Sequence, residues 1–306
     1  MPSIRSHIWR AVLKSSTNWN LSLDALRAKT EKSARMATMP KGVVVTPVQA
    51  GRVRAEWLEP ARAPRDKAML YLHGGGYVMG SCATHRALAA RLAKACDVRV
   101  LVIDYRLAPE HPHPAALEDS LDAYQWLMNQ GFAPADLIVA GDSAGGGLVL
   151  STLVSLRDAG APLPAMAICL SPWTDLAGTG ESLTTKAKLD PWVTADALAL
   201  GAHYIGGNDP RHPLISPLYA DLHGLPATLI HVGSDEILLS DSTRLAERAK
   251  AAGVDVTLKI WDRMWHVFHC FAPLIPEADH AIADIAGYVR SRSSPTRPPT
   301  APIETL

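Results

Sequence analysis

The sequence predicts an α/β protein with a mostly parallel sheet of eight strands, flanked by helices and carrying a helical cap. Three observations support this prediction. Strand-like apolar runs alternate with helical segments along most of the chain. The 306 residues suffice for one large domain plus an insertion. Two further helical segments, near the N-terminus and after residue 178, interrupt the alternation, and long insertions in such folds are often lids.

The strands and helices follow one another in a definite order. Two opening strands, at 43–48 and 53–58, are expected to form an antiparallel hairpin at one edge of the sheet. Later strand-like runs lie at 68–72, 98–103, 137–140, 165–170, 228–233 and 255–261. Helical segments lie at about 84–95, 115–129, 146–159, 239–252 and 277–290. Gly253 stands where helices commonly end.

This order divides the chain into a core and a cap. The core is expected in two parts, at 41–177 and 218–292. The cap is expected to come from an N-terminal segment at 1–40 and an insertion at 178–217, and a mobile tail is expected at 293–306. The first segment is predicted to form two amphipathic helices, and one face of the first carries Ile4, Ile8, Trp9 and Val12. We expect the two cap segments to pack together over Ser143 and to exclude water there.

The composition argues against several classes of function. Lys and Arg total 30, as do Asp and Glu, so no general attraction to nucleic acid or to an anionic membrane is expected. No apolar stretch reaches the length of about 18 residues that suggests a transmembrane helix. Arg5, Arg10 and Lys14 break any signal-peptide core, and the four cysteines lack metal-site spacing. We therefore expect a cytoplasmic protein, and the motifs described next call for no metal or organic cofactor.

A candidate nucleophile follows the strand-like run at 137–140. The chain continues there as Gly-Asp-Ser-Ala-Gly, a G-x-S-x-G motif between a strand and a helix, with Ser143 at its centre. A sharp turn at this point lifts the serine hydroxyl clear of both elements, and only small neighbours such as Gly141 and Gly145 allow it. The motif alone also occurs by chance in glycine-rich loops.

A second signal is the glycine loop after the strand at 68–72. Its residues are His73, Gly74, Gly75, Gly76 and Tyr77. Such a loop can turn backbone N–H groups toward one point, as acyl transfer requires for the developing oxyanion. The expected donors are the amides of Gly75 and Gly76 together with that of Ala144. A phosphate-binding loop would be followed by Lys and Ser or Thr, which are absent here.

A third signal is the order of an acid and a base downstream of Ser143. Asp235 lies at the carboxyl end of the strand at 228–233, where α/β sheets place their sites, and His266 lies in the loop after the last strand. Glu236 is the main alternative to Asp235, because one position decides which side chain leaves the strand toward the histidine. The sequence analysis favours Asp235. His269 is a weaker candidate for the base.

These motifs together resemble those of the bacterial hormone-sensitive-lipase-like (family IV) esterases, within the α/β-hydrolase superfamily. The resemblance covers most of the chain and rests on HGGG at 73–76, DYRLAPE at 104–110, GDSAGG at 141–146, SPWTDL at 171–176 and GSDEIL at 233–238. It implies an α/β-hydrolase fold with Ser143 as nucleophile, Asp235 as acid and His266 as base. It also implies that His73 and Gly74 support the oxyanion loop.

Two departures from the family pattern are visible. Ser240 precedes Asp241 where the family often has two acids, and this change is expected to leave the chemistry intact. Met264 and Trp265 precede the histidine where many members have glycine, which suggests a narrower or more apolar pocket. The candidate pocket residues are Tyr77, Trp192, Tyr204, Trp265 and Val267.

The resemblance implies hydrolysis of carboxylic esters with short to medium acyl chains through an acyl-enzyme, and some relatives open lactones. An amidase or formamidase using the same triad is an alternative. A binding protein is another, since plant gibberellin receptors share the fold, but those receptors lack the base that His266 supplies here. The partner is thus expected to be a small-molecule ester. A homodimer through the edge strand near Lys259 is also compatible with the sequence.

Overall fold

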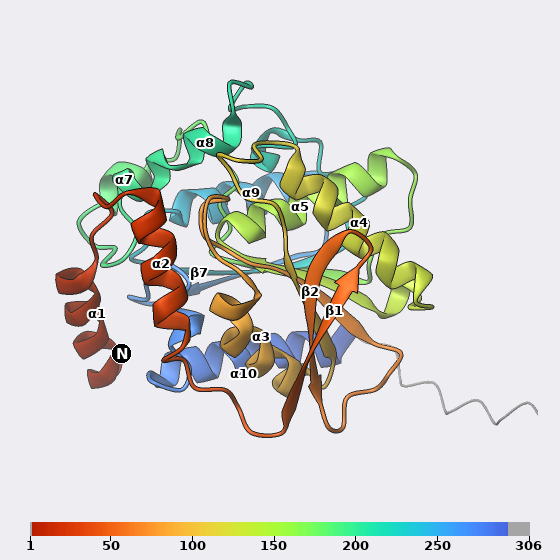
Figure 1. The fold of residues 1–306 in the computed structure, drawn as a ribbon. Helices are drawn as coiled ribbons and strands as arrows, with labels where there is room; N and C mark the ends of the chain where they lie inside the picture. The colour runs from red at the N-terminus through yellow and green to blue at the C-terminus, as the bar shows by residue number, and fades with distance from the viewer. Residues whose placement is uncertain (1, 293–306) are drawn as a thin grey trace, which may run out of the picture.

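The computed structural model describes residues 2–292, and the predicted tail at 293–306 lies outside them. Eight strands form one sheet in the order β1-β2-β4-β3-β5-β6-β7-β8 (Figure 1). They are β1 (Val43–Ala50), β2 (Val53–Pro60), β3 (Ala68–Leu72), β4 (Arg99–Asp104), β5 (Leu137–Asp142), β6 (Met166–Leu170), β7 (Ala227–Gly233) and β8 (Val256–Trp261). β2 pairs antiparallel with both β1 and β4, and every other pairing is parallel. The predicted fold class and the opening hairpin are confirmed.

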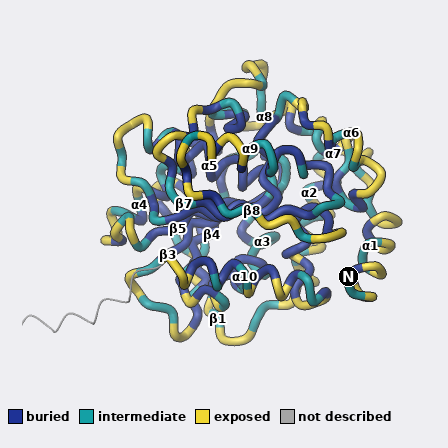
Figure 2. The backbone as a smooth tube through the Cα atoms, turned by 180° about the vertical axis from the view of Figure 1, so that it is seen from behind, coloured by how far each residue is buried: buried dark blue, intermediate teal, exposed yellow. Residues whose placement is uncertain are grey.

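Helices cover both faces of the sheet. On one face lie α3 (Cys82–Cys96) and α10 (Pro276–Arg292), and on the other α4 (Ala115–Asn129), α5 (Ala144–Asp158) and α9 (Leu239–Ala251). Two hydrophobic clusters fill these two layers, and Figure 2 shows the buried backbone concentrated along the central strands. β3, β5 and β6 have no partly exposed residue, as expected for parallel strands covered on both sides.

The parallel register brings the carboxyl ends of the strands to one edge. Leu72 of β3 lies opposite Gly141 of β5, and Leu170 of β6 lies opposite Asp142 of β5 and His231 of β7. The loops that follow these strands therefore meet at this edge, which is where open α/β sheets bind their ligands. The motifs singled out in the sequence lie in these loops.

The two predicted cap segments contact each other. The first contains α1 (Ile4–Ser16) and α2 (Leu23–Ala34), and the second contains α6 (Ser182–Thr185), α7 (Ala195–Ala199) and α8 (Gly201–Ile205). The indole N–H of Trp19 donates to the carbonyl of Trp192 at 2.7 Å. In Figures 1 and 2, α1 and α2 lie beside α7 on one side of the molecule.

The first helix does not bury the apolar face that its sequence suggests. Ile4, Ile8 and Val12 are 80 %, 57 % and 42 % exposed, whereas Leu13 is buried and Trp9 packs edge-on against Phe271. On its inward side, Arg10 binds the carbonyl of Leu189 and the carboxylate of Asp235, and these contacts favour this rotation of the helix. None of the helices described between residues 2 and 292 combines the length and apolar character needed to cross a bilayer.

Candidate active site

Ser143 occupies a strained turn between β5 and α5. Its φ of 51° and ψ of −121° are rare for a residue with a side chain. Backbone hydrogen bonds hold this conformation: its N–H donates to Leu170, and its carbonyl accepts from Gly147 and Trp173, all within 3.1 Å. A Cβ on Gly145 would lie 2.0 Å from the carbonyl oxygen of Leu72, so only glycine allows α5 to approach β3 this closely.

The glycine loop after β3 presents free N–H groups beside this turn. Gly75 has a φ of 119°, and its carbonyl accepts from the N–H groups of Val78 and Met79, which closes a tight turn. Within residues 2–292, the N–H groups of Gly75, Gly76 and Ala144 donate to no protein oxygen. Such donors can receive an oxyanion.

Asp142, next to Ser143, fastens the glycine loop to the turn. Its Oδ1 accepts from the N–H of Gly74 at 3.1 Å and from the Tyr71 hydroxyl at 2.7 Å. Its Oδ2 lies 3.3 Å from Nε2 of His85. Burial raises the pKa of Asp142, but the charge and hydrogen bond of His85 outweigh burial, and the pKa ends below its ordinary value.

His73 supports the same loop from behind. Its ring is fully buried, stacked on Tyr105 with centroids 4.1 Å apart and on His85 at 5.3 Å. Its Nδ1 lies 2.8 Å from the carbonyl oxygen of Gly74. Burial lowers the pKa of His73 to about 4, so the ring is neutral at physiological pH. These are the contacts that His73 and Gly74 make, and their support of an oxyanion loop stays a prediction.

His266 pairs with a buried carboxylate. Its Nδ1 lies 3.2 Å from Oε1 of Glu236, and both side chains are almost completely buried. Burial lowers the pKa of His266, but the hydrogen bond and the charge of Glu236 outweigh burial and raise the pKa above its ordinary value. An Nδ1 proton held by a carboxylate leaves Nε2 as the proton acceptor.

The predicted partner of the histidine is wrong. Asp235 turns away from His266, and its Oδ2 lies 3.0 Å from Nη2 of Arg10 in α1. Glu236 instead points inward, where its Oε2 also accepts from the N–H of Gly233 at 2.8 Å. The backbone of Asp235 is held by the carbonyl of Met264, and this fixes which of the two adjacent acids faces the ring. Pattern and spacing alone do not specify that choice.

Ser171 joins three parts of this site and was missed as a site residue. It directly follows β6 and has a φ of 48°. Its hydroxyl donates to Oε2 of Glu236 at 2.7 Å and accepts from the N–H of Val267 at 3.1 Å. Its own N–H donates to the carbonyl of His231. The hydroxyl thus orients the carboxylate of Glu236 and holds the residue that follows His266. The serine at the start of SPWTDL is the only sequence signal for it.

His269, the weaker candidate for the base, belongs to another network. It is fully buried, and its Nε2 lies 3.3 Å from Nδ1 of His231, whose Nε2 faces Asp284 at 3.1 Å. Burial holds the pKa of His269 well below its ordinary value. His266 is therefore the histidine that meets a carboxylate at this edge of the sheet.

The five candidate pocket residues are packed among other side chains. Tyr77 stacks on Tyr204 with ring centroids 3.7 Å apart, and Trp192 and Trp265 both pack edge-on against Phe271. Val267 is buried with a φ of 45°. A cavity of about 440 Å³ lies nearby, lined by Arg27, Glu31, Met79, Gly80, Leu107, Glu110 and His111 and by none of these five.

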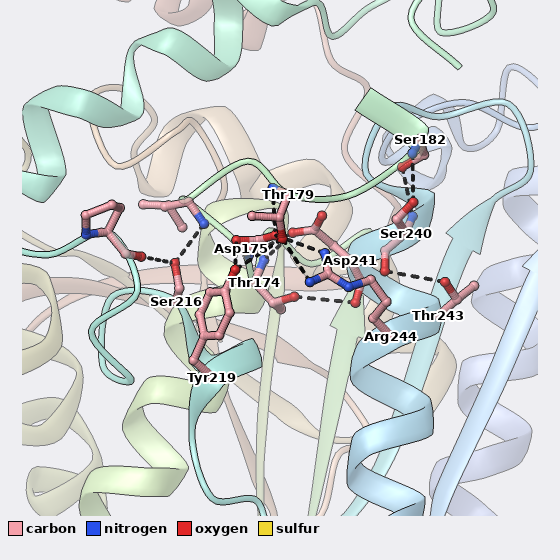
Figure 3. A network of polar contacts seen from close by, with 12 residues as sticks. Thr174, Asp175, Thr179, Ser182, Ser216, Tyr219, Ser240, Asp241, Thr243 and Arg244 are labelled. Carbon is pink, nitrogen blue, oxygen red and sulfur yellow. Dashed lines mark hydrogen bonds and ion pairs between the residues drawn. The ribbon is translucent and has the colours of Figure 1, made fainter. Parts of the chain in front are cut away.

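A second polar network anchors the cap insertion to the core (Figure 3). Oδ2 of Asp241 accepts from the N–H groups of Thr174 and Asp175 at 2.8 and 2.9 Å. The carboxylate of Asp175 in turn binds Thr179, Tyr219 and Arg244. Ser240, one of the departures from the family pattern, exchanges hydrogen bonds with Ser182 of the insertion.

Known proteins are similar to this chain in sequence and in fold. A family model described as the alpha/beta hydrolase fold matches residues 69–270. The chain is 47 % identical over 254 residues to an acetyl-hydrolase of Streptomyces hygroscopicus, covering 83 % of this chain and 84 % of that protein. It is 39 % identical over 284 residues to an esterase of Acinetobacter venetianus, covering 92 % and 93 %.

A solved esterase from the bacterial hormone-sensitive lipase family is 44 % identical to the chain, with a TM-score of 0.92, and the match covers 96 % of this chain and 100 % of that one. Together with the sheet topology and the motifs at its edge, these matches confirm the predicted family. The chain belongs to the bacterial hormone-sensitive-lipase-like esterases of the α/β-hydrolase superfamily, and it is a carboxylic ester hydrolase.

Proposed function

We propose that the protein is a serine carboxylesterase in which Ser143 is the nucleophile, His266 the base and Glu236 the acid. The observation that carries this proposal is the hydrogen bond between His266 and the buried Glu236 at the sheet edge that also carries the strained Ser143. We further propose that the N–H groups of Gly75, Gly76 and Ala144 form the oxyanion hole.

The reaction follows from these groups. Nε2 of His266 accepts the proton of the Ser143 hydroxyl as its oxygen attacks the ester carbonyl carbon. Glu236 holds the imidazole in the required tautomer and stabilises the imidazolium. The carbonyl oxygen, now negatively charged, accepts hydrogen bonds from the three backbone amides. When the C–O bond breaks, the alcohol leaves with the proton from His266, and water hydrolyses the acyl-enzyme by the same steps.

We propose short to medium acyl esters as the substrates. The relative from Streptomyces hygroscopicus is named an acetyl-hydrolase, and the packed aromatic side chains around Tyr77 and Trp265 favour compact acyl or alcohol groups over long chains. A compact lactone is compatible with the same surroundings. The cap formed by 1–40 and 178–217 is proposed to close over Ser143 and to exclude water during the reaction.

Two other functions are alternatives to ester hydrolysis, and the experiment below distinguishes them from it. An amidase or formamidase would use the same triad, and a binding protein would need no base. The pairing of His266 with Glu236 favours catalysis over binding alone.

A homodimer through β8 is part of the proposal because β8 is an edge strand and its Ile260 is 51 % exposed.

Hydrolysis of p-nitrophenyl esters from acetate to decanoate, measured for the wild type and S143A, tests the proposal. We expect the highest kcat/KM at short to medium chain lengths and an S143A variant that is folded and inactive. A serine-directed organophosphonate should label the wild type and not S143A. Faster turnover of an aryl amide or an N-formyl compound than of any ester would identify an amidase. Unchanged activity in S143A would contradict the nucleophile assignment.

A further inference from the structure

The two chain neighbours of Glu236 are both held by the cap. Asp235, the residue before it, binds Arg10 of α1, and Ile237, the residue after it, binds Asp190 of the cap insertion. Resting on the proposed function, we propose that Arg10 and Asp190 are positioning residues that clamp the acid of the triad in line with His266. The cap then has a role in the reaction beyond covering the site.

Arg10 makes the N-terminal half of this clamp. Its guanidinium donates to Oδ2 of Asp235 at 3.0 Å, to the carbonyl of Leu189 at 2.7 Å and to the carbonyl of Arg263. It also lies over the ring of Trp265, with Cζ 5.7 Å from the ring centroid. One planar fork therefore connects α1 with the cap insertion, the acid loop and the loop that carries His266. A lysine, whose three donors all lie on one nitrogen, could not reproduce this fork.

Asp190 makes the other half. It is 6 % exposed, and its Oδ1 accepts from the N–H groups of Trp192 and Val193 within its own loop. Its Oδ2 accepts from the N–H of Ile237 at 3.1 Å. Ser182 of the same insertion donates its hydroxyl to the carbonyl of Ile237 at 2.6 Å. The cap insertion thus holds both polar backbone groups of the residue that follows Glu236.

The two halves meet and form a closed circuit. Arg10 binds the carbonyl of Leu189, and Leu189 is the chain neighbour of Asp190. The circuit runs from Arg10 through Asp235, Glu236 and Ile237 to Asp190 and returns through Leu189. A shift of the cap would therefore move the backbone on both sides of Glu236. Displacing a catalytic group by about 1 Å can cost on the order of 100-fold in rate.

Burial raises the pKa of Asp190 to about 6, so above that pH Asp190 also adds negative charge near the base. The charged or titratable groups that act on His266 are Glu236, Asp190 and Asp142, together with the neutral ring of His269. All three carboxylates favour the protonated imidazole. Removing one of them should lower the pKa at which His266 loses its proton.

The test compares R10Q and D190N with R5Q, using p-nitrophenyl butyrate hydrolysis. R5Q removes the same charge from the same helix, and Arg5 is exposed and has no hydrogen bond or ion pair within the described chain. In D190N the amide oxygen keeps the contacts to Trp192 and Val193, while its NH₂ group faces the N–H of Ile237 and breaks the link to the acid loop. Thermal melts establish that each variant is folded at the assay temperature.

We expect kcat to fall about 10-fold or more in R10Q and D190N with little change in KM, because these changes misalign Glu236 with His266 and leave substrate binding intact. R10K should recover part of the loss, since it keeps a charge beside Asp235. The acidic limb of the kcat/KM profile should move to lower pH in D190N. R5Q should match the wild type.

The clamp is overturned if folded R10Q and D190N match R5Q in kcat and pH profile while S143A is inactive, and the proposed function then stands. It is also overturned if activity falls only in proportion to the folded fraction. Activity that persists in S143A overturns the proposed function itself, and the clamp with it.

Discussion

Oε1 of Glu236 lies 3.2 Å from Nδ1 of His266, whereas the carboxylate of its neighbour Asp235 lies 3.0 Å from Arg10. Two adjacent acids thus point in opposite directions from one turn, one into the site and one toward the cap. In the proposed mechanism, this relationship determines which carboxylate can orient His266. It also decides the outcome of several experiments.

The pH dependence of activity should reflect the raised pKa of His266. The imidazole must be neutral to accept the serine proton, and the charge of Glu236 raises its pKa above 6.5 despite burial. We therefore expect kcat/KM to rise with pH through a midpoint above 6.5. Measuring kcat/KM against pH with p-nitrophenyl acetate checks this. A midpoint below the ordinary histidine value would show that burial outweighs the carboxylate.

S171A should impair both activity and stability. The change removes the donor to Oε2 of Glu236 and the acceptor of the Val267 N–H, so both the acid and the loop after the base lose a restraint. The loss of stability should be about 1–3 kcal/mol, as for buried polar groups left unpaired. S151A is the matched control, because Ser151 is equally buried and its hydroxyl bonds only within α5. Equal kcat values for folded S171A and S151A would refute a role in the site.

Two substitutions at Asp142 separate its contacts. D142A removes the acceptor of the Gly74 N–H and should lower kcat by about 100-fold, comparable to the loss of one oxyanion donor. D142N keeps an oxygen for Gly74 and Tyr71 and loses the negative charge, which faces His85 and also favours protonated His266. We expect D142N to keep most of the activity. Steady-state kinetics should give a lower kcat for D142A than for D142N. A lower kcat for D142N would show that the charge of Asp142, and not its hydrogen bond to Gly74, supports activity.

Glycine substitutions should distinguish the turn at Ser143 from an ordinary helix. In G145A the new Cβ would lie 2.0 Å from the Leu72 carbonyl oxygen, which must push α5 away from β3 and abolish activity. In G287A nothing lies within 4 Å of the new Cβ in α10, and alanine should stabilise the helix by about 0.5–1 kcal/mol. Denaturant melts and esterase assays compare the two. An active, stable G145A would mean that the turn is looser than described.

The sequence predicts much of this protein because its main features are local. Apolar runs fixed the strands, and the small residues around Ser143 and at 74–76 predicted a sharp turn and a donor loop. Which of Asp235 and Glu236 faces His266 depends instead on contacts with Met264, Ser171 and Arg10, which are distant in the sequence. Long-range partners of this kind leave no periodic pattern in the sequence. For the same reason the sequence does not predict the contacts of Ser171 and Asp190.

The orientation of the first helix shows the same limit. Its apolar residues Ile4, Ile8 and Val12 predict an inward face, yet they are exposed. The guanidinium of Arg10, whose side chain is 23 % exposed, binds three acceptors in loops of the core and of the cap insertion. Of the predicted apolar face, only Trp9 packs inward, against Phe271, and the polar contacts of Arg10 accompany this orientation of the helix.

The most direct measurement compares kcat for E236Q and D235N with that of the wild type. If Glu236 is the acid, E236Q should lose about 10⁴-fold in kcat, the scale seen when the orienting acid of a serine hydrolase becomes an amide. D235N should lose no more than about 10-fold, since it disturbs only the contact with Arg10. A larger loss in D235N than in E236Q, with both variants folded, would contradict the account.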